Sequence, residues 1–240
     1  MCWSLFLSKI DPTKDQYYID FGAGATKRTI NATLLAQKLG PEVSKALIGL
    51  HAFTGCDFIP CFRGKGKVRP FSVMNKNEKM IAAFGALGQE ESVPADVAGS
   101  LEAFVCRLYG SNLNSVNEAR VQTFLKNAEP MKGKSMFEGM KKIDPAQFPP
   151  CACALERHIA RTNYVALLWR NSHLPKQTAK PPEEMGWLLT DSQYIPEWDN
   201  KAPLPKDLDF TDSHEEENED EDEDEENFSS SSSDDSGDSD

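Results

Sequence analysis

Residues 41 to 74 read PEVSKALIGLHAFTGCDFIPCFRGKGKVRPFSVM, and this stretch is the most informative part of the chain. Apolar residues recur at helical spacing from Val43 to Leu50, and Pro41 suits the first turn of a helix because its missing N–H is not needed there. A proline-containing turn and a Gly-Lys-Gly-Lys loop then lead into a second apolar run that ends at Met74. The stretch therefore predicts two helices joined by a basic, glycine-rich connection.

The first half of that connection carries an isolated carboxylate. Gly55 permits a tight turn at the helix end, which would lift the Asp57 carboxylate clear of the core. Pro60 makes the following connection rigid. Carboxylate oxygens are ligands that Mg²⁺ prefers, so we predict that Asp57 is a metal ligand, with Gly55 and Pro60 as turn-forming residues. The alternative is that Asp57 forms an ordinary turn by bonding to nearby N–H groups.

The second half of the connection is suited to binding phosphate. Glycines let the backbone approach an anion closely with its N–H groups, and the basic side chains add affinity that does not depend on nucleotide sequence. The predicted phosphate-binding residues are Gly64, Lys65, Gly66, Lys67 and Arg69. The alternative is an ordinary exposed turn.

Hydrophobic periodicity on either side of this stretch predicts an α/β start followed by a mainly helical region. Strands are expected over residues 3–10, 16–21 and 28–30, and a short helix capped by Asn31 is expected to end at Gly40. Further helices are expected over 79–87, from Pro94 after a Ser92 cap, after Ser115, and over 155–169. Residues 174–206 are expected to be irregular. We predict three regions, 1–74, 75–206 and a disordered acidic tail at 207–240.

Charge is divided unevenly along the 240 residues, whose formal net charge is −12. From Asp207 onward lie 18 of the 38 acidic residues and no Lys or Arg, so the first 206 residues carry 26 basic against 20 acidic residues, a net of about +6. The basic part is suited to nucleic acid, duplex or branched DNA. The tail would compete for that basic surface or bind basic proteins such as histones, and a nuclear location is expected.

The N-terminal sequence and the cysteines limit the other possibilities. A run of 18 apolar residues is absent, which argues against a membrane span, and residues 1–11 lack the features of a signal peptide. This start resembles a buried strand that begins abruptly, so we expect the chain to be the downstream part of a longer domain. The six cysteines form no C-x-x-C pair and are expected to be reduced. Zinc binding by Cys151, Cys153 and His158 is the less favoured alternative.

At Gly55–Pro60 and Gly64–Lys67 the chain resembles the helix–two-turn–helix of flap endonucleases and XPG-like nucleases, which have a PIN-like fold. The resemblance implies that Asp57 belongs to a Mg²⁺-binding acidic cluster. It also implies that the glycine hairpin binds the phosphates of duplex DNA, with a monovalent cation. A closer likeness, over roughly residues 16–206, is to uncharacterised transposon-associated animal proteins with a TGCD and GKGK pattern.

The chain departs from the nuclease pattern in its carboxylates. Hydrolysis with two metals needs several carboxylates, and Asp11, Asp15 and Asp20 stand in no recognisable metal-site motif. We therefore favour a nucleic-acid-binding protein related to flap-type nucleases that lacks a complete catalytic site. The alternatives are an active Mg²⁺-dependent endonuclease that uses other acids, and a non-enzymatic nuclear protein that binds histones through its tail. The arginines at 157, 161 and 170 are expected on a solvated helix face, and His51 is expected to be packed.

Overall fold

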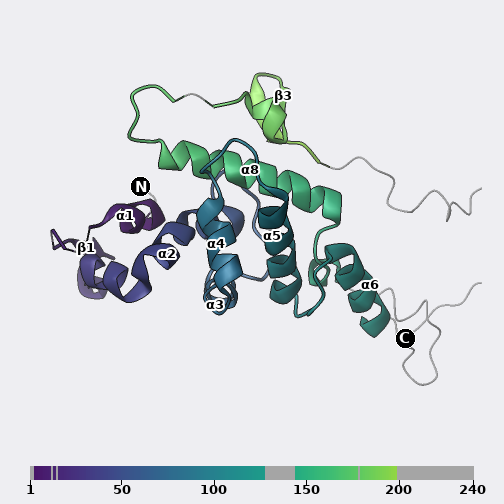
Figure 1. Ribbon diagram of the computed structural model, residues 1–240, viewed down its shortest axis with the longest axis horizontal. Coiled ribbons are helices and arrows are strands. Elements are labelled where there is room, and N and C mark those ends of the chain that lie inside the picture. The colour runs from purple at the N-terminus through teal and green to yellow at the C-terminus, as the bar shows by residue number, and fades with distance from the viewer. Residues whose placement is uncertain (1–2, 12, 15, 128–143, 178, 199–240) are drawn as a thin grey trace, which may run out of the picture. The chain divides into compact units, whose positions relative to one another are not determined.

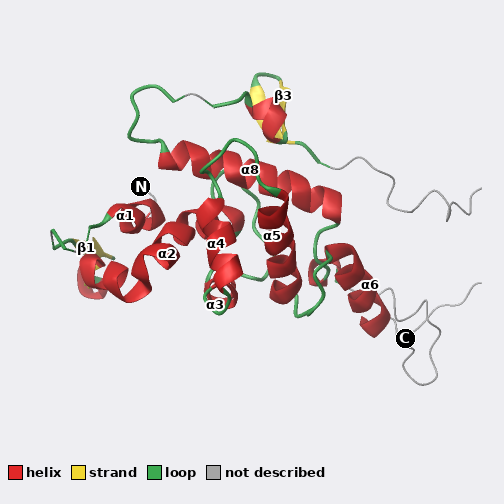
Figure 2. Ribbon diagram, viewed as in Figure 1, coloured by secondary structure: helices red, strands yellow, loops and turns green. Residues whose placement is uncertain are grey.

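The computed structural model describes residues 3–198 except for 12, 15, 128–143 and 178 (Figure 1). A small hairpin near the N-terminus is followed by a mainly helical region, which confirms the predicted fold class (Figure 2). The predicted acidic tail lies outside the described residues. The α-helices are α1 (Trp3–Lys9), α2 (Ala32–Phe53), α3 (Val68–Met74), α4 (Glu78–Ala86), α5 (Ala95–Leu108), α6 (Val116–Asn127) and α8 (Ala152–Arg170). The strands are β1 (Tyr18–Phe21), β2 (Arg28–Asn31), β3 (Trp187–Thr190) and β4 (Gln193–Pro196), and short 3-10 helices are η1 (Gly24–Thr26), η2 (Pro145–Gln147) and η3 (Pro182–Met185).

Helix α2 contains the break that its sequence predicts. The Asn31 side chain caps its start by accepting a hydrogen bond from the N–H of Leu34 at 2.8 Å. Gly40 then has φ 76° and ψ 166°, a conformation outside the helical range that glycine adopts without strain. The helical ladder resumes at Pro41, so the two helices predicted on either side of Gly40 are present as one kinked element.

Two predicted elements are wrong, and each for a physical reason. Residues 3–9 form a helix instead of a strand, because Leu7 packs against Ala32 and Ala36 of α2, with Phe6 and Ile10 beside it at helical spacing. The segment expected to be irregular contains the antiparallel β3–β4 hairpin. Its two-residue turn, Asp191-Ser192, has positive φ at both positions (49° and 63°), as a type I′ hairpin turn requires. A smaller difference is that Pro94, and not Ser92, is the N-cap residue of α5.

The largest core is built around the C-terminal end of α2. The ring of Phe53, fully buried, lies 5.5 Å from that of Phe84 in α4 and 5.9 Å from that of Phe104 in α5. The rings of Phe62 and His158 approach the same phenylalanine at 5.4 and 4.9 Å. This packing fixes the last turn of α2, from which the connection to α3 begins.

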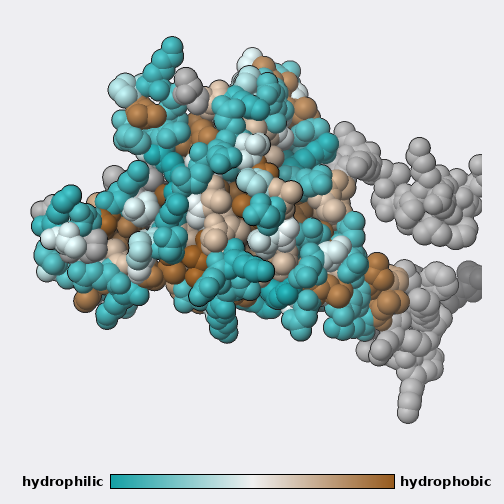
Figure 3. All heavy atoms as spheres, in the orientation of Figure 1, coloured by the Kyte–Doolittle hydropathy of each residue, from teal (hydrophilic) through white to brown (hydrophobic). Residues whose placement is uncertain are grey.

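Some hydrophobic side chains lie outside the core. Figure 3 shows hydrophobic atoms on the surface of α6, where Val121 and Leu125 are each 58% exposed. The β3–β4 hairpin also exposes the apolar side chains of Leu188, Leu189 and Ile195, while its Trp187 is buried. Among the described residues, helices long and apolar enough to cross a bilayer are absent.

Candidate phosphate-binding site

The second lysine of the Gly-Lys-Gly-Lys loop closes the C-terminal end of α2. The ammonium group of Lys67 donates hydrogen bonds to the carbonyl of His51 at 2.8 Å, to the hydroxyl of Thr54 at 2.9 Å, and to the carbonyl of Gly55. A helix leaves its last carbonyls without helical partners and carries partial negative charge at that end, so a cation here is stabilising. Lys67 therefore has a structural role that the sequence did not predict.

The chain between α2 and this lysine folds back tightly on itself. Gly55 has φ 108°, and a Cβ atom at this position would lie 2.5 Å from the Cβ of Cys61. The backbones of Cys56 and Ile59 exchange hydrogen bonds of 3.0 and 3.3 Å, and Ile59 is buried. Pro60, which is half-buried, follows this turn. Gly55 is thus required both by its backbone angle and by the close approach of the returning chain.

The Asp57 carboxylate stands at the exposed tip of this turn. Within the described part of the chain, groups of three or more His, Cys, Asp or Glu side chains that could hold a metal ion are absent. One carboxylate alone holds Mg²⁺ poorly, so the described residues do not fit a magnesium centre. The role of Asp57 as a metal ligand stays a prediction.

The other acids considered for a metal site are engaged near the N-terminus. Hydrogen bonds from Thr13, reinforced by Lys14, lower the pKa of Asp11 to about 2. Hydrogen bonds from Lys27 and then Thr29 lower the pKa of Asp20. Asp15 lies outside the described residues. A monovalent cation at the loop also stays a prediction, and the three oxygens at the end of α2 already receive the ammonium group of Lys67.

The basic hollow is an open depression of about 620 Å³ on the outer side of α3, lined by Lys65, Gly66, Lys67, Val68, Arg69, Ser72, Val73 and Lys76. Gly64 and Gly66 have φ of 72° and 58°, and a Cβ atom at either position would meet no heavy atom within 4 Å. The glycine turn is therefore open on this side, where a ligand could approach the backbone. The ammonium group of Lys65 lies 4.1 Å from the centre of the Tyr109 ring, which holds the side chain at one end of the hollow.

The charges of Lys65, Arg69 and Lys76 in the basic hollow are not balanced by carboxylates in the described part of the chain. Ion pairs there link other side chains, and none includes Lys65, Arg69 or Lys76. Partial burial, and then repulsion from Arg69, lowers the pKa of Lys65. An anion bound between these cations would relieve that repulsion.

Sequence reasoning missed two polar residues of the hollow, Ser72 and Lys76. The signal was available, because Ser72 and Lys76 follow Arg69 at intervals of three and four residues.

The arginines of α8 are not the solvated face that was predicted. Arg161 is only 2% exposed, and its Nη1 donates to the carbonyls of Gly186 at 2.9 Å and Glu197 at 3.1 Å. Arg170 donates to the carbonyls of Leu87, Gly85 and Lys45, and so closes the end of α4. Arg157 pairs with the Glu197 carboxylate at 3.0 Å. These guanidinium groups link α8, which carries all three arginines, to other elements of the same chain.

Two of the candidate zinc ligands lie apart from the third. The Sγ atoms of Cys151 and Cys153 are 3.4 Å apart at the start of α8, while His158 points into the core, with Nε2 2.8 Å from the carbonyl oxygen of Phe53. Burial is the main reason that the pKa of His158 falls to about 4. His51, by contrast, was expected to be packed, and its ring lies 5.6 Å from the ring of Trp169.

No protein-family model, curated protein or solved structure matches this chain. The resemblance to flap-type nucleases therefore stays a prediction, and function is inferred from the residues of the site.

Proposed function

We propose that the protein binds the phosphate backbone of nucleic acid through the basic hollow and lacks a complete catalytic site of its own. One observation carries the proposal: three basic side chains, Lys65, Arg69 and Lys76, line an open depression beside a glycine turn, and no described carboxylate pairs with them.

The form of the hollow favours a polyanion over a small anion. The depression is open, and its cations are spread from the loop before α3 to the turn after it, so a small anion would stay largely hydrated and contact few of them at once. A nucleic-acid backbone presents phosphates in series and can contact several of these cations together. Such binding releases counterions, so it weakens steeply as salt rises and is indifferent to base sequence.

The test compares two full-length triple variants in binding to a fluorescently labelled DNA duplex at low salt, by anisotropy. Lys65→Gln, Arg69→Gln and Lys76→Gln together should weaken binding at least about tenfold, because three phosphate contacts are lost. Substitution of three exposed lysines on α1, α2 and α6 (Lys9→Gln, Lys38→Gln and Lys126→Gln) removes the same charge away from the hollow and should have little effect.

Absence of duplex binding by the unsubstituted chain at low salt would refute the proposal. Equal losses in the two triple variants would show that overall charge, and not the hollow, attracts the DNA. Incubation of a branched DNA with Mg²⁺ should leave the DNA intact. Cleavage that is lost in Asp57→Asn would instead establish the nuclease alternative.

A further inference from the structure

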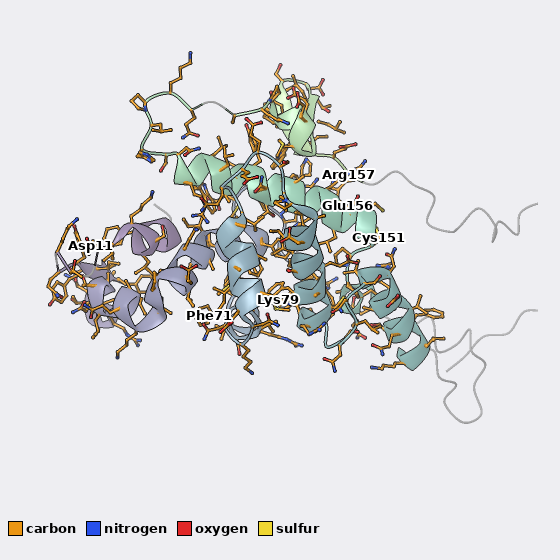
Figure 4. All side chains as sticks on the ribbon, in the orientation of Figure 1. Asp11, Phe71, Lys79, Cys151, Glu156 and Arg157 are labelled. Carbon is orange, nitrogen blue, oxygen red and sulfur yellow. The ribbon has the colours of Figure 1, made fainter. Side chains whose placement is uncertain are left out.

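Two cysteines at the start of α8 lie close enough to react with each other. Cys151 (Figure 4) is the N-cap residue of this helix, and Cys153 lies in its first turn. Their Sγ atoms are 3.4 Å apart, and both residues are partly exposed thiols. A disulfide bond is about 2.0 Å long, so bond formation requires the two sulfur atoms to approach by about 1.4 Å. Side-chain rotation supplies a movement of this size.

A structural metal fits this pair less well than a disulfide. Zinc in structural sites takes four protein ligands, and the described residues provide no group of three or more suitable side chains. His158 is directed toward the Phe53 carbonyl, in the core. A disulfide needs only the two sulfur atoms that the helix start already brings together.

We propose that Cys151 and Cys153 are a redox site, which forms a reversible disulfide within α8 by exchange with a low-molecular-weight disulfide such as oxidised glutathione. One cysteine thiolate attacks a sulfur of the glutathione disulfide, which forms a mixed disulfide and releases one glutathione thiolate. The second cysteine thiolate then attacks the protein sulfur of that mixed disulfide and releases the second glutathione. The protein loses two electrons and two protons, and one glutathione disulfide becomes two molecules of reduced glutathione.

The other described thiols are placed differently. Cys106 is fully buried in the core, where burial raises its pKa to about 11, so little reactive thiolate forms. Cys56 and Cys61 flank the turn that follows Gly55, and among the described thiols the sulfur–sulfur contact of 3.4 Å belongs to Cys151 and Cys153. The fold therefore selects the pair at 151 and 153 for oxidation.

The segment that carries the two cysteines also links α8 to α6 through hydrogen bonds. The N–H of Ala152, between the two cysteines, donates to the Asn117 side chain of α6 at 3.1 Å. Nη1 of Arg120, also in α6, donates to the carbonyl of Pro149 at 2.6 Å. A disulfide across the turn would change the backbone that carries these bonds, so oxidation at this site reaches the contact between α6 and α8.

The experiment incubates the reduced full-length chain in glutathione redox buffers, quenches with acid, alkylates the remaining thiols and maps the peptides by mass spectrometry. The peptide with Cys151 and Cys153 should lose two hydrogen atoms and escape alkylation, under conditions in which Cys56, Cys61 and Cys106 are still alkylated. In Cys153→Ser, the reaction should stop at a glutathione adduct on Cys151. Cys56→Ser with Cys61→Ser is the matched control and should oxidise as the unsubstituted chain does.

The same titration in concentrated urea separates a site preset by the fold from two cysteines that are merely neighbours in sequence. The folded chain should oxidise at a ratio of oxidised to reduced glutathione at least about tenfold lower than the unfolded chain, because folding pre-positions the thiols. Equal ratios in the folded and unfolded chains would overturn the proposal. Stable glutathione adducts on both cysteines, without an internal disulfide, would also overturn it.

Discussion

The two lysines of the Gly-Lys-Gly-Lys loop should differ in what they contribute to stability. Lys67→Met keeps the apolar stem of the side chain but removes the ammonium group that bonds to His51, Thr54 and Gly55. A cation at a helix C-terminus contributes about 0.3–1 kcal/mol. Hydrogen bonds from a charged group contribute about 1.5–3 kcal/mol, of which solvent exposure of this lysine removes a large part. We expect Lys67→Met to lower the free energy of unfolding by about 1–2 kcal/mol.

Lys65→Met is the matched control, since it removes the same charge from the same loop. It loses the contact with Tyr109, worth about 0.5–1 kcal/mol at an exposed site, but also the repulsion from Arg69. Its unfolding free energy should therefore stay within about 0.5 kcal/mol of the original.

Thermal and urea unfolding, followed by circular dichroism, give the Tm and the free energy of unfolding of both variants. Lys67→Met should lower Tm by about 2–8 °C, and Lys65→Met should leave it nearly unchanged. Equal Tm values for Lys67→Met and the unsubstituted chain would refute the structural role of Lys67.

Three further predictions concern pH, the glycine turn and the tail. Burial holds the pKa of His158 near 4, below its ordinary 6.5, so the folded chain favours the neutral ring. The free energy of unfolding is therefore highest above about pH 6.5 and decreases as the pH falls toward 4. In urea unfolding, the free energy of unfolding should fall by roughly 2 kcal/mol from about pH 7 to about pH 5, and this fall should be absent in His158→Gln. The same pH dependence in both proteins would contradict this prediction. Gly55→Ala should lower the free energy of unfolding by about 3 kcal/mol or more, because the new Cβ atom combines a positive φ with a close contact with Cys61. Gly64→Ala has the positive φ without such a contact and should cost only about 1 kcal/mol. Equal costs would show that the close approach to Cys61 is unimportant. Truncation of the chain after Lys206 changes the net charge from −12 to about +6, so the truncated chain should bind duplex DNA at least about tenfold more tightly at low salt. Equal affinities of the truncated and full-length chains in anisotropy titrations would contradict competition by the tail.

Features of the fold that depend on neighbouring residues were predictable from the sequence. Asn31 caps α2 through the N–H three residues on, and Gly40 interrupts the same helix where its backbone leaves the helical range. The apolar spacing of α4 and α8 likewise placed both helices to within a few residues. The strand predicted at residues 3–10 failed because a short apolar run fits a strand or a helix equally well, and packing against α2 decided between them.

The roles of the basic side chains were less predictable, because they depend on contacts between distant parts of the chain. Lys67 bonds to a carbonyl 16 residues earlier, and Arg170 to one 83 residues earlier. A sequence shows that a side chain is cationic, but not whether the folded chain directs a helix end toward it. Lys65, Arg69 and Lys76 have no carboxylate partner in the described structure, whereas Lys67 bonds to the end of α2, and this distinction required the structure.

The dependence of duplex DNA affinity on salt concentration tests the central proposal most directly. Each phosphate contact adds about 0.9 to the slope of log K against log salt concentration. Loss of three contacts in the variant with Lys65→Gln, Arg69→Gln and Lys76→Gln should therefore reduce the slope by about 2–3, while the variant with Lys9→Gln, Lys38→Gln and Lys126→Gln should keep the original slope. Identical slopes in all three proteins would contradict phosphate binding at the basic hollow.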